Sequence, residues 1–199
     1  MRTQQETEET ASQQMHYRIA RGLVLACPIV IALLQLLPGP SETNPRLDER
    51  ENLETNLAVP VPVSAMLQRA CMNCHSSETR WPWYARMAPV SWVIAKDVSE
   101  ARRAMNLSRW STRNGRRPEL AIATLTAACE DLRYARMPKW SYRLLHPEAQ
   151  VSKLEVEQFC AWANGEVRQL VRKKRQQGRG KNAKLLQAGS KKPSGSKKL

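Results

Sequence analysis

The chain has 199 residues and a formal net charge of +14. Its length allows one domain with additional segments. Twelve of the 32 Lys and Arg residues lie between residues 168 and 199, where there is no Asp or Glu. The rest of the chain keeps 20 basic and 18 acidic residues, a net charge of only +2, which argues against a basic nucleic-acid-binding groove on the folded part.

The N-terminal part predicts a membrane anchor. Residues 1–18 are polar, whereas residues 19–37 are mostly apolar, and no charge occurs from Gly22 to Leu37. A spanning helix needs about 20 such residues. Arg18 and Arg21 on its N-terminal side predict a cytoplasmic N-terminus. No A-x-A site follows the apolar run, so the pattern favours an uncleaved, single-pass signal anchor over a cleaved signal peptide.

Residues 38–59 show little apolar periodicity and are interpreted as a linker, which leads to a folded domain over residues 60–166. The most informative segment of the chain lies near the start of this domain. It is Cys71-Met-Asn-Cys74-His75, the C-x-x-C-H pattern of c-type haem attachment. Two thiols spaced by two residues on a helical turn reach the two vinyl groups of one porphyrin. The next residue, His75, then offers its imidazole to the iron as proximal ligand.

Two other interpretations of the cysteine pair are weaker. A thioredoxin-like redox pair expects a βαβ setting, and none is recognisable nearby. A structural zinc site needs a second pair of ligands, which Cys129 and Cys160 do not supply because they are far apart in the sequence. Outside the cytoplasm these two cysteines can form a disulfide, although buried thiols fit their apolar surroundings equally well.

Apolar stripes at helical spacing predict that the domain is all-α, with no strand-like alternation. A small cytochrome c-like arrangement follows, in which the last helix packs across the helix that carries the attachment motif. Ser152 and Glu155 have the spacing of a capping box that opens the last helix, which is predicted to end near Gly165. The stripes are Val63, Met66, Leu67 and Ala70; Trp92, Ala95, Val98, Ala101 and Met105; Ala121, Leu125, Ala128, Cys129 and Leu132; and Val156, Phe159, Cys160 and Ala163.

A low-spin haem needs a sixth iron ligand, and Met137 is the first choice. It follows a predicted helix and precedes a proline that would stiffen its loop. A thioether ligand favours ferrous iron and raises the reduction potential. His146 is the main rival, because bis-histidine ligation is chemically ordinary; its alternative role is that of a surface turn residue before Pro147. Met87 is a weaker rival.

Aromatic and basic residues near the motif suggest how the haem pocket is completed. Trp83, with five further tryptophans, is predicted to pack against the haem, although each of them singly fits an ordinary core. Arg80 and Arg86 are candidates for pairing with the two haem propionates, the alternative being solvated side chains.

The segment from residue 167 to 199 is rich in Lys, Arg, Gln, Gly and Ser, a composition that predicts disorder. The simplest interpretation is a solvated extension. The alternative is attraction to anionic lipid headgroups beside the anchor.

Several of these residues stand in longer motifs. The segment Cys71-Met-Asn-Cys-His-Ser-Ser-Glu-Thr-Arg-Trp-Pro-Trp-Tyr84, with Met137-Pro138 and Leu145-His146-Pro147-Glu148-Ala149 later in the chain, closely resembles the bacterial haem-binding domain family. The resemblance spans about residues 45–164. It implies a membrane-anchored, periplasm-facing protein with one covalent haem c at Cys71, Cys74 and His75, and Met137 in the place of the family's Met-Pro. The long basic tail and the long cytoplasmic N-terminus depart from that pattern.

We therefore expect an electron carrier rather than a catalyst, located in the bacterial inner membrane and working with a redox partner protein. The alternatives are a haem-based sensor of small ligands or a peroxidase-like enzyme. Both require an open or displaceable sixth iron position, and the enzyme also requires a distal acid-base group. A nucleic-acid partner is not expected, because the predicted topology places the basic tail outside the cytoplasm.

Overall fold

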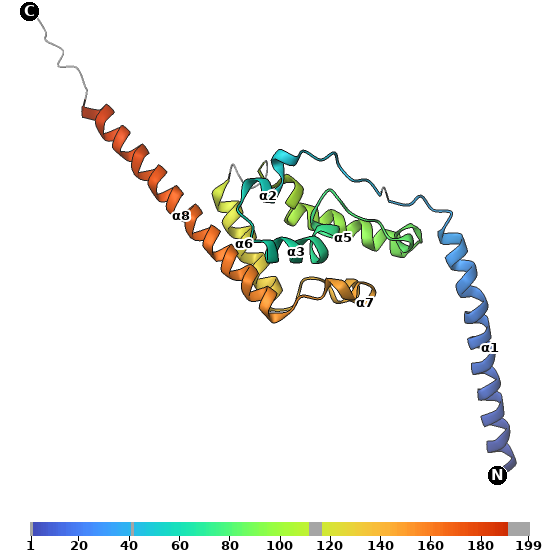
Figure 1. Cartoon of the computed structure of the whole chain (residues 1–199). Coiled ribbons are helices and arrows are strands. Elements are labelled where there is room, and N and C mark those ends of the chain that lie inside the picture. The colour runs from blue at the N-terminus through green and yellow to red at the C-terminus, as the bar shows by residue number, and fades with distance from the viewer. Residues whose placement is uncertain (1, 41, 112–116, 191–199) are drawn as a thin grey trace, which may run out of the picture. The chain divides into compact units, whose positions relative to one another are not determined.

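The computed structural model describes residues 2–40, 42–111 and 117–190, and these residues form helices without any strand, which confirms the all-α prediction (Figure 1). They divide into two compact units, Met1–Thr43 with Arg80–Ser99 and Asn44–Thr79 with Glu100–Leu199. The helices are α1 (Arg2–Leu34), α2 (Leu53–Asn56), α3 (Val61–Ala70), α4 (Met72–His75), α5 (Val90–Ala104), α6 (Pro118–Arg133), α7 (Trp140–Leu145) and α8 (Lys153–Ser190). Short 3-10 turns are η1 (Glu49–Glu51), η2 (Trp83–Arg86), η3 (Leu107–Arg109) and η5 (Pro147–Ala149).

The first unit contains the candidate membrane helix. Within α1, Gln14–Leu34 is 21 residues long and apolar enough to cross a membrane, and none of it is buried. The helix ends three residues before the predicted boundary at Leu37. There the side chain of Gln35 donates to the carbonyls of Ile31 and Ala88, both at 2.9 Å, and accepts from the amide of Ala88 at 3.0 Å. A signal sequence near the N-terminus meets the same criteria of length and composition.

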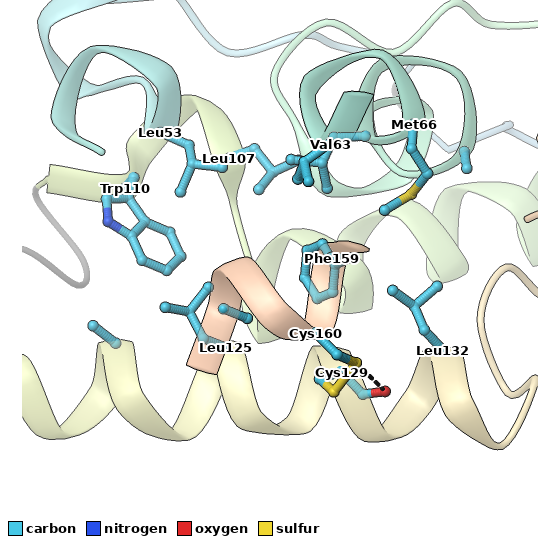
Figure 2. Packing of buried hydrophobic residues seen from close by; sticks show 14 residues of the cluster. Leu53, Val63, Met66, Leu107, Trp110, Leu125, Cys129, Leu132, Phe159 and Cys160 are labelled. Atoms are coloured by element: carbon cyan, nitrogen blue, oxygen red, sulfur yellow. Dashed lines mark hydrogen bonds between the residues drawn. A yellow bond between two sulfur atoms is a disulfide. The ribbon is translucent and has the colours of Figure 1, made fainter. Parts of the chain in front are cut away.

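The second unit is built around one hydrophobic core to which α3, α6 and α8 contribute (Figure 2). The apolar stripes predicted from the sequence supply most of it, since Met66, Leu125 and Phe159 are each at most 2% exposed. The contact between α3 and α8 confirms that the last helix packs against the one that leads to the attachment motif. Burial of apolar surface stabilises a fold by about 25 cal/mol per Å², so this core is the main stabilising element of the unit.

A disulfide joins Cys129 of α6 to Cys160 of α8 inside the core, which settles the choice between a bridge and two buried thiols (Figure 2). The two residues are 31 positions apart, so the bond closes a loop of that size in the unfolded chain. A disulfide stabilises chiefly by restricting the unfolded chain.

Removing this disulfide is expected to lower the free energy of unfolding by about 3 to 4 kcal/mol, the chain-entropy value for such a loop. The test is urea unfolding of the Cys129→Ala/Cys160→Ala variant in detergent, followed by circular dichroism. Cys27→Ser, at an exposed position in α1, is the control. A wild-type unfolding curve that does not move on reduction with dithiothreitol would contradict the assignment.

The predicted capping box opens α8. The Glu155 carboxylate accepts from the amide and the hydroxyl of Ser152, both at 2.8 Å, and the Ser152 hydroxyl accepts from the Glu155 amide at 3.3 Å. Arg69 of α3 also pairs with Glu155. The Arg69 guanidinium further donates to the carbonyls of Glu148 and Gln150, both at 2.6 Å, and so ties α3 to the start of α8.

Hydrogen bonds from the Ser152 amide and from Arg69 lower the pKa of Glu155 to about 2. Because this folded-state pKa is depressed, the stabilisation is complete above the ordinary pKa of 4.5 and is lost as the pH falls toward 2. We expect Glu155→Gln to cost about 2 kcal/mol at pH 7 and to flatten the dependence of stability on pH between 5 and 2. Urea unfolding over this pH range measures both effects. Glu157→Gln, an exposed position on the same helix, is the control, and coincident curves for the two variants would contradict the prediction.

Two predicted boundaries were wrong. The linker 38–59 includes η1 and α2, and Leu53 is 2% exposed within the core, because a single apolar side chain can be buried without any periodic pattern. The last helix does not end near Gly165 but continues to Ser190, so residues 167–190 are helical rather than disordered. Lys, Arg, Gln and Ala favour helix, and an isolated glycine costs only about 1 kcal/mol. Residues 191–199 of the predicted tail lie outside the described residues.

The contacts of α6 show that α8 runs antiparallel to it. Cys160 is bonded to Cys129, while Lys174 pairs with Glu119 in the first turn of α6 at 2.7 Å. The residues of α8 from 172 to 180 are exposed. This basic stretch is compatible both with a solvated extension and with contact with anionic lipid headgroups.

Candidate functional site

The attachment motif lies where α3 passes into the single turn α4. Cys71 ends α3, with its amide donating to the Leu67 carbonyl at 2.9 Å, and it also begins α4. The Cys71 carbonyl then accepts from the amides of Cys74 at 3.2 Å and His75 at 2.9 Å. One turn of backbone therefore carries both thiols and the imidazole.

A backbone carbonyl orients the imidazole of His75. Its Nδ1–H donates to the carbonyl of Met105, just after α5, at 3.1 Å. The other ring nitrogen, Nε2, is therefore the one that carries the lone pair needed to bind a metal. Burial lowers the pKa of His75, against the smaller opposing effect of the Met105 and Ala101 carbonyls. The ring is neutral at pH 7, which is the protonation state that a metal ligand requires.

The environment of Cys71 differs from that of a redox-active cysteine. Burial raises the pKa of its thiol to about 12, and the neighbouring Cys74 raises it further, with Arg69 acting weakly in the other direction. Reactive cysteines in C-x-x-C redox pairs instead have a lowered pKa, because the thiolate is the nucleophile. Cys71 and Cys74 are not joined in a disulfide. The structure thus gives no support to the thioredoxin-like alternative.

The described residues do not support a structural zinc site at the cysteine pair either. Over the described ranges of the chain, no three or more His, Cys, Asp or Glu side chains gather into a group that could hold a metal ion. Cys129 and Cys160, the remaining candidates for a second ligand pair, are consumed by their disulfide.

Polar side chains fix the loop that follows the motif. The Ser76 hydroxyl donates to the Met72 carbonyl, and the Thr79 hydroxyl to the Asn73 carbonyl, each at 2.7 Å. The guanidinium of Arg102 donates to the Ser76 carbonyl at 2.7 Å and to the Thr79 hydroxyl at 2.9 Å. Ser76 and Thr79 belong to the motif that carries the family resemblance. Arg102 was missed, because nothing in the sequence of α5 distinguishes it from a solvated arginine.

The short helix α7 is linked to the attachment loop through Asn73, the residue just before Cys74. Its side-chain amide donates to the Tyr142 hydroxyl at 2.7 Å. The Tyr142 ring stacks on the His146 ring, with centroids 4.3 Å apart. The Nδ1 atom of His146 also lies 2.9 Å from a carboxylate oxygen of Glu148. These two contacts hold the His146 ring at the end of α7, and the role of His146 as the rival sixth ligand stays a prediction.

Comparison with known proteins adds one finding to this geometry. The model of the haem-binding domain family matches residues 29–165, the larger part of the chain. The chain belongs to the haem-binding domain family. No curated protein and no solved structure matches the chain. Haem is accordingly the cofactor of this domain, and the matched range includes the attachment motif, Met137 and His146.

The residues of this haem-binding domain fit the group chemically. Cys71 and Cys74 offer two thiols on one turn, and His75 offers a neutral imidazole that is oriented through Nδ1. Three buried side-chain atoms also lack a hydrogen-bond partner within the described part of the chain: Ser77 Oγ, Trp81 Nε1 and Arg143 Nε. Buried polar atoms of native proteins are nearly always paired. Ser77 and Arg143 belong to the same unit as the attachment motif, and their unpaired donors are of the kind that a group with carboxylates would satisfy.

Met137 lies on the loop between α6 and α7. The chain leaves α6 through Ala135, whose φ of 51° is in the left-handed region. The Met137 amide then donates to the Asp131 carbonyl at 3.2 Å. Met137 is half-buried and Pro138 is buried, so the loop is packed against the domain. The choice of Met137 as sixth iron ligand stays a prediction.

The predicted pocket residues Arg80, Trp83 and Arg86 belong to the first unit. Trp83 is 75% exposed, and Arg86 is exposed and pairs with Glu42 at 3.4 Å. Arg80 is also exposed. Their contacts with haem and its propionates stay predictions. Of the other tryptophans, Trp110 is 2% exposed in the hydrophobic core of the second unit, where packing alone accounts for it.

Proposed function

We propose that this protein is a membrane-anchored monohaem c-type cytochrome that transfers single electrons on the periplasmic side of the inner membrane. Cys71 and Cys74 hold the haem through thioethers, His75 is the proximal ligand and Met137 is the sixth ligand. The observation that carries the proposal is the orientation of His75 by the Met105 carbonyl, on the same turn that carries both thiols. The single C-x-x-C-H motif supports one haem per chain.

When bound, haem supplies an iron that alternates between the ferric and ferrous states. The chain sets the conditions for that exchange. The Nδ1–H bond from His75 raises the basicity of the ligating nitrogen, and a thioether at the sixth position raises the potential. The bonds of Arg102 to Ser76 and Thr79 hold the attachment loop in one conformation.

The cellular location is supported by two features. Arg18 and Arg21 flank the N-terminal side of the apolar helix, which favours a cytoplasmic N-terminus. The buried disulfide between Cys129 and Cys160 favours an oxidising compartment for the domain that follows. A membrane tether would also raise the effective concentration of the haem domain beside membrane-bound redox enzymes.

The test is an optical spectrum series on the full chain, exported together with haem-attachment machinery. Spectra are recorded oxidised, reduced, and reduced under carbon monoxide. A low-spin spectrum with a weak far-red methionine–iron band, unchanged by carbon monoxide, is the expected result. A high-spin ferric spectrum or a ready response to carbon monoxide would replace electron transfer by ligand sensing or peroxidase-like catalysis at an open sixth position.

A further inference from the structure

Arg143 of α7 carries one of the three unpaired buried donors. Its Nε atom is buried and has no hydrogen-bond partner within residues 2–40, 42–111 and 117–190. The side chain as a whole is half-buried. A buried guanidinium nitrogen without a hydrogen-bond partner is rare in native structures, because nothing offsets the loss of its hydration.

Arg143 lies on α7, the short helix that contacts the attachment segment. Its neighbour Tyr142 accepts a 2.7 Å hydrogen bond from Asn73, which stands between the two attachment cysteines. Its own amide donates to the Lys139 carbonyl at 3.1 Å, so it lies on the turn that follows the Met137–Pro138 loop. The helix that carries Arg143 is thus linked to the segment of the proximal ligand through Tyr142 and follows the loop of the proposed sixth ligand in the chain.

We propose that the guanidinium of Arg143 binds a haem propionate. This inference rests on the proposed function, since it requires haem at Cys71, Cys74 and His75. Haem brings two carboxylates into an otherwise apolar site, and the planar fork of arginine matches a carboxylate with two parallel hydrogen bonds. The other two unpaired donors, Ser77 Oγ and Trp81 Nε1, are neutral and cannot balance that charge.

The arginines that the sequence suggested for this role are less suitable. Arg86 is exposed and already pairs with Glu42, and Arg80 is exposed. An exposed ion pair contributes little, whereas a partly buried guanidinium gains more from a carboxylate that shares its desolvated surroundings.

The test uses the full chain, exported with haem-attachment machinery, as wild type and as Arg143→Leu, Arg143→Gln and Arg143→Lys variants. Arg133→Leu, an exposed arginine at the end of α6, is the matched control. Covalent haem is quantified first by the pyridine haemochrome assay. The propionate bending band is then recorded by resonance Raman spectroscopy, and the reduction potential is measured by titration.

Arg143→Leu is expected to shift the bending band to lower frequency and to lower the potential, because an unbalanced propionate charge favours ferric iron. The expected change in the ferric-to-ferrous ratio at fixed applied potential is about threefold to tenfold, and tenfold corresponds to about 59 mV. Arg143→Gln should also lower the potential, and Arg143→Lys should largely preserve it while shifting the band. Arg133→Leu should change neither quantity.

Haem-loaded Leu and Gln variants with the wild-type band and potential would overturn the assignment of Arg143 and leave the proposed function intact. If the Leu variant fails to mature, the Gln and Lys variants decide by the same two readouts. Absence of covalent haem from the wild-type chain would instead defeat the proposed function itself.

Discussion

Replacement of both Cys71 and Cys74 by serine is expected to abolish covalent haem attachment completely, while either single substitution leaves one thioether. Each thiol has its own vinyl partner, so the two bonds are lost independently. The neutral thiol of Cys71, whose pKa is raised by burial, cannot be replaced by a hydroxyl in this addition. The measurement is intact-protein mass spectrometry with haem staining after denaturing electrophoresis. The single variants should also show a shifted pyridine haemochrome band.

Cys27→Ser is the matched control, because Cys27 is an exposed thiol in α1 and lies far from the motif in sequence. It should retain the full mass increase of one haem. A wild-type chain that binds haem but releases it on denaturation would show that the cofactor is held without thioethers. In that case the family assignment would stand, but the c-type assignment would be wrong.

The elements that could be predicted from the sequence are those whose cause is local. Periodic apolar residues produced α3, α5 and α6, with Pro118 in the first turn of α6. The reciprocal hydrogen bonds of Ser152 and Glu155 follow from their spacing alone. The attachment motif was recognisable for the same reason, since one turn carries all three of its functional side chains.

The features that escaped prediction depend on contacts between distant segments. The Met105 carbonyl orients His75 across 30 residues, and any residue type could supply this backbone acceptor, so the sequence does not reveal it. Tyr142 reaches Asn73 across 69 residues, and Arg102 reaches Ser76 across 26. Which polar side chains face each other is decided by how the helices pack, and no local pattern encodes that.

The length of α8 was not predicted from the sequence for a different reason. Composition rich in Lys, Arg and Gln describes both a disordered tail and an exposed helix. The disulfide of Cys160 with Cys129 and the ion pair of Lys174 with Glu119 hold α8 alongside α6. The apolar periodicity predicted only the buried part of α8, because the exposed part carries no apolar stripe.

The second large effect concerns the sixth ligand. Met137→Ala is expected to remove the far-red methionine–iron band, to convert the ferric haem to high spin and to allow carbon monoxide to bind the reduced protein. Loss of the thioether should also lower the reduction potential by a sizeable part of the roughly 0.8 V range that axial ligands span. The measurements are optical spectra with and without carbon monoxide, and a redox titration.

His146→Phe is the matched variant for the rival ligand. Phenylalanine keeps a ring to stack on Tyr142 but removes both nitrogen atoms, including the contact with Glu148. If Met137 is the ligand, this variant keeps the wild-type spectrum and changes stability little, because the contact with Glu148 is exposed. If His146 is the ligand, His146→Phe should instead become high-spin and bind carbon monoxide, and Met137→Ala should keep the wild-type spectrum.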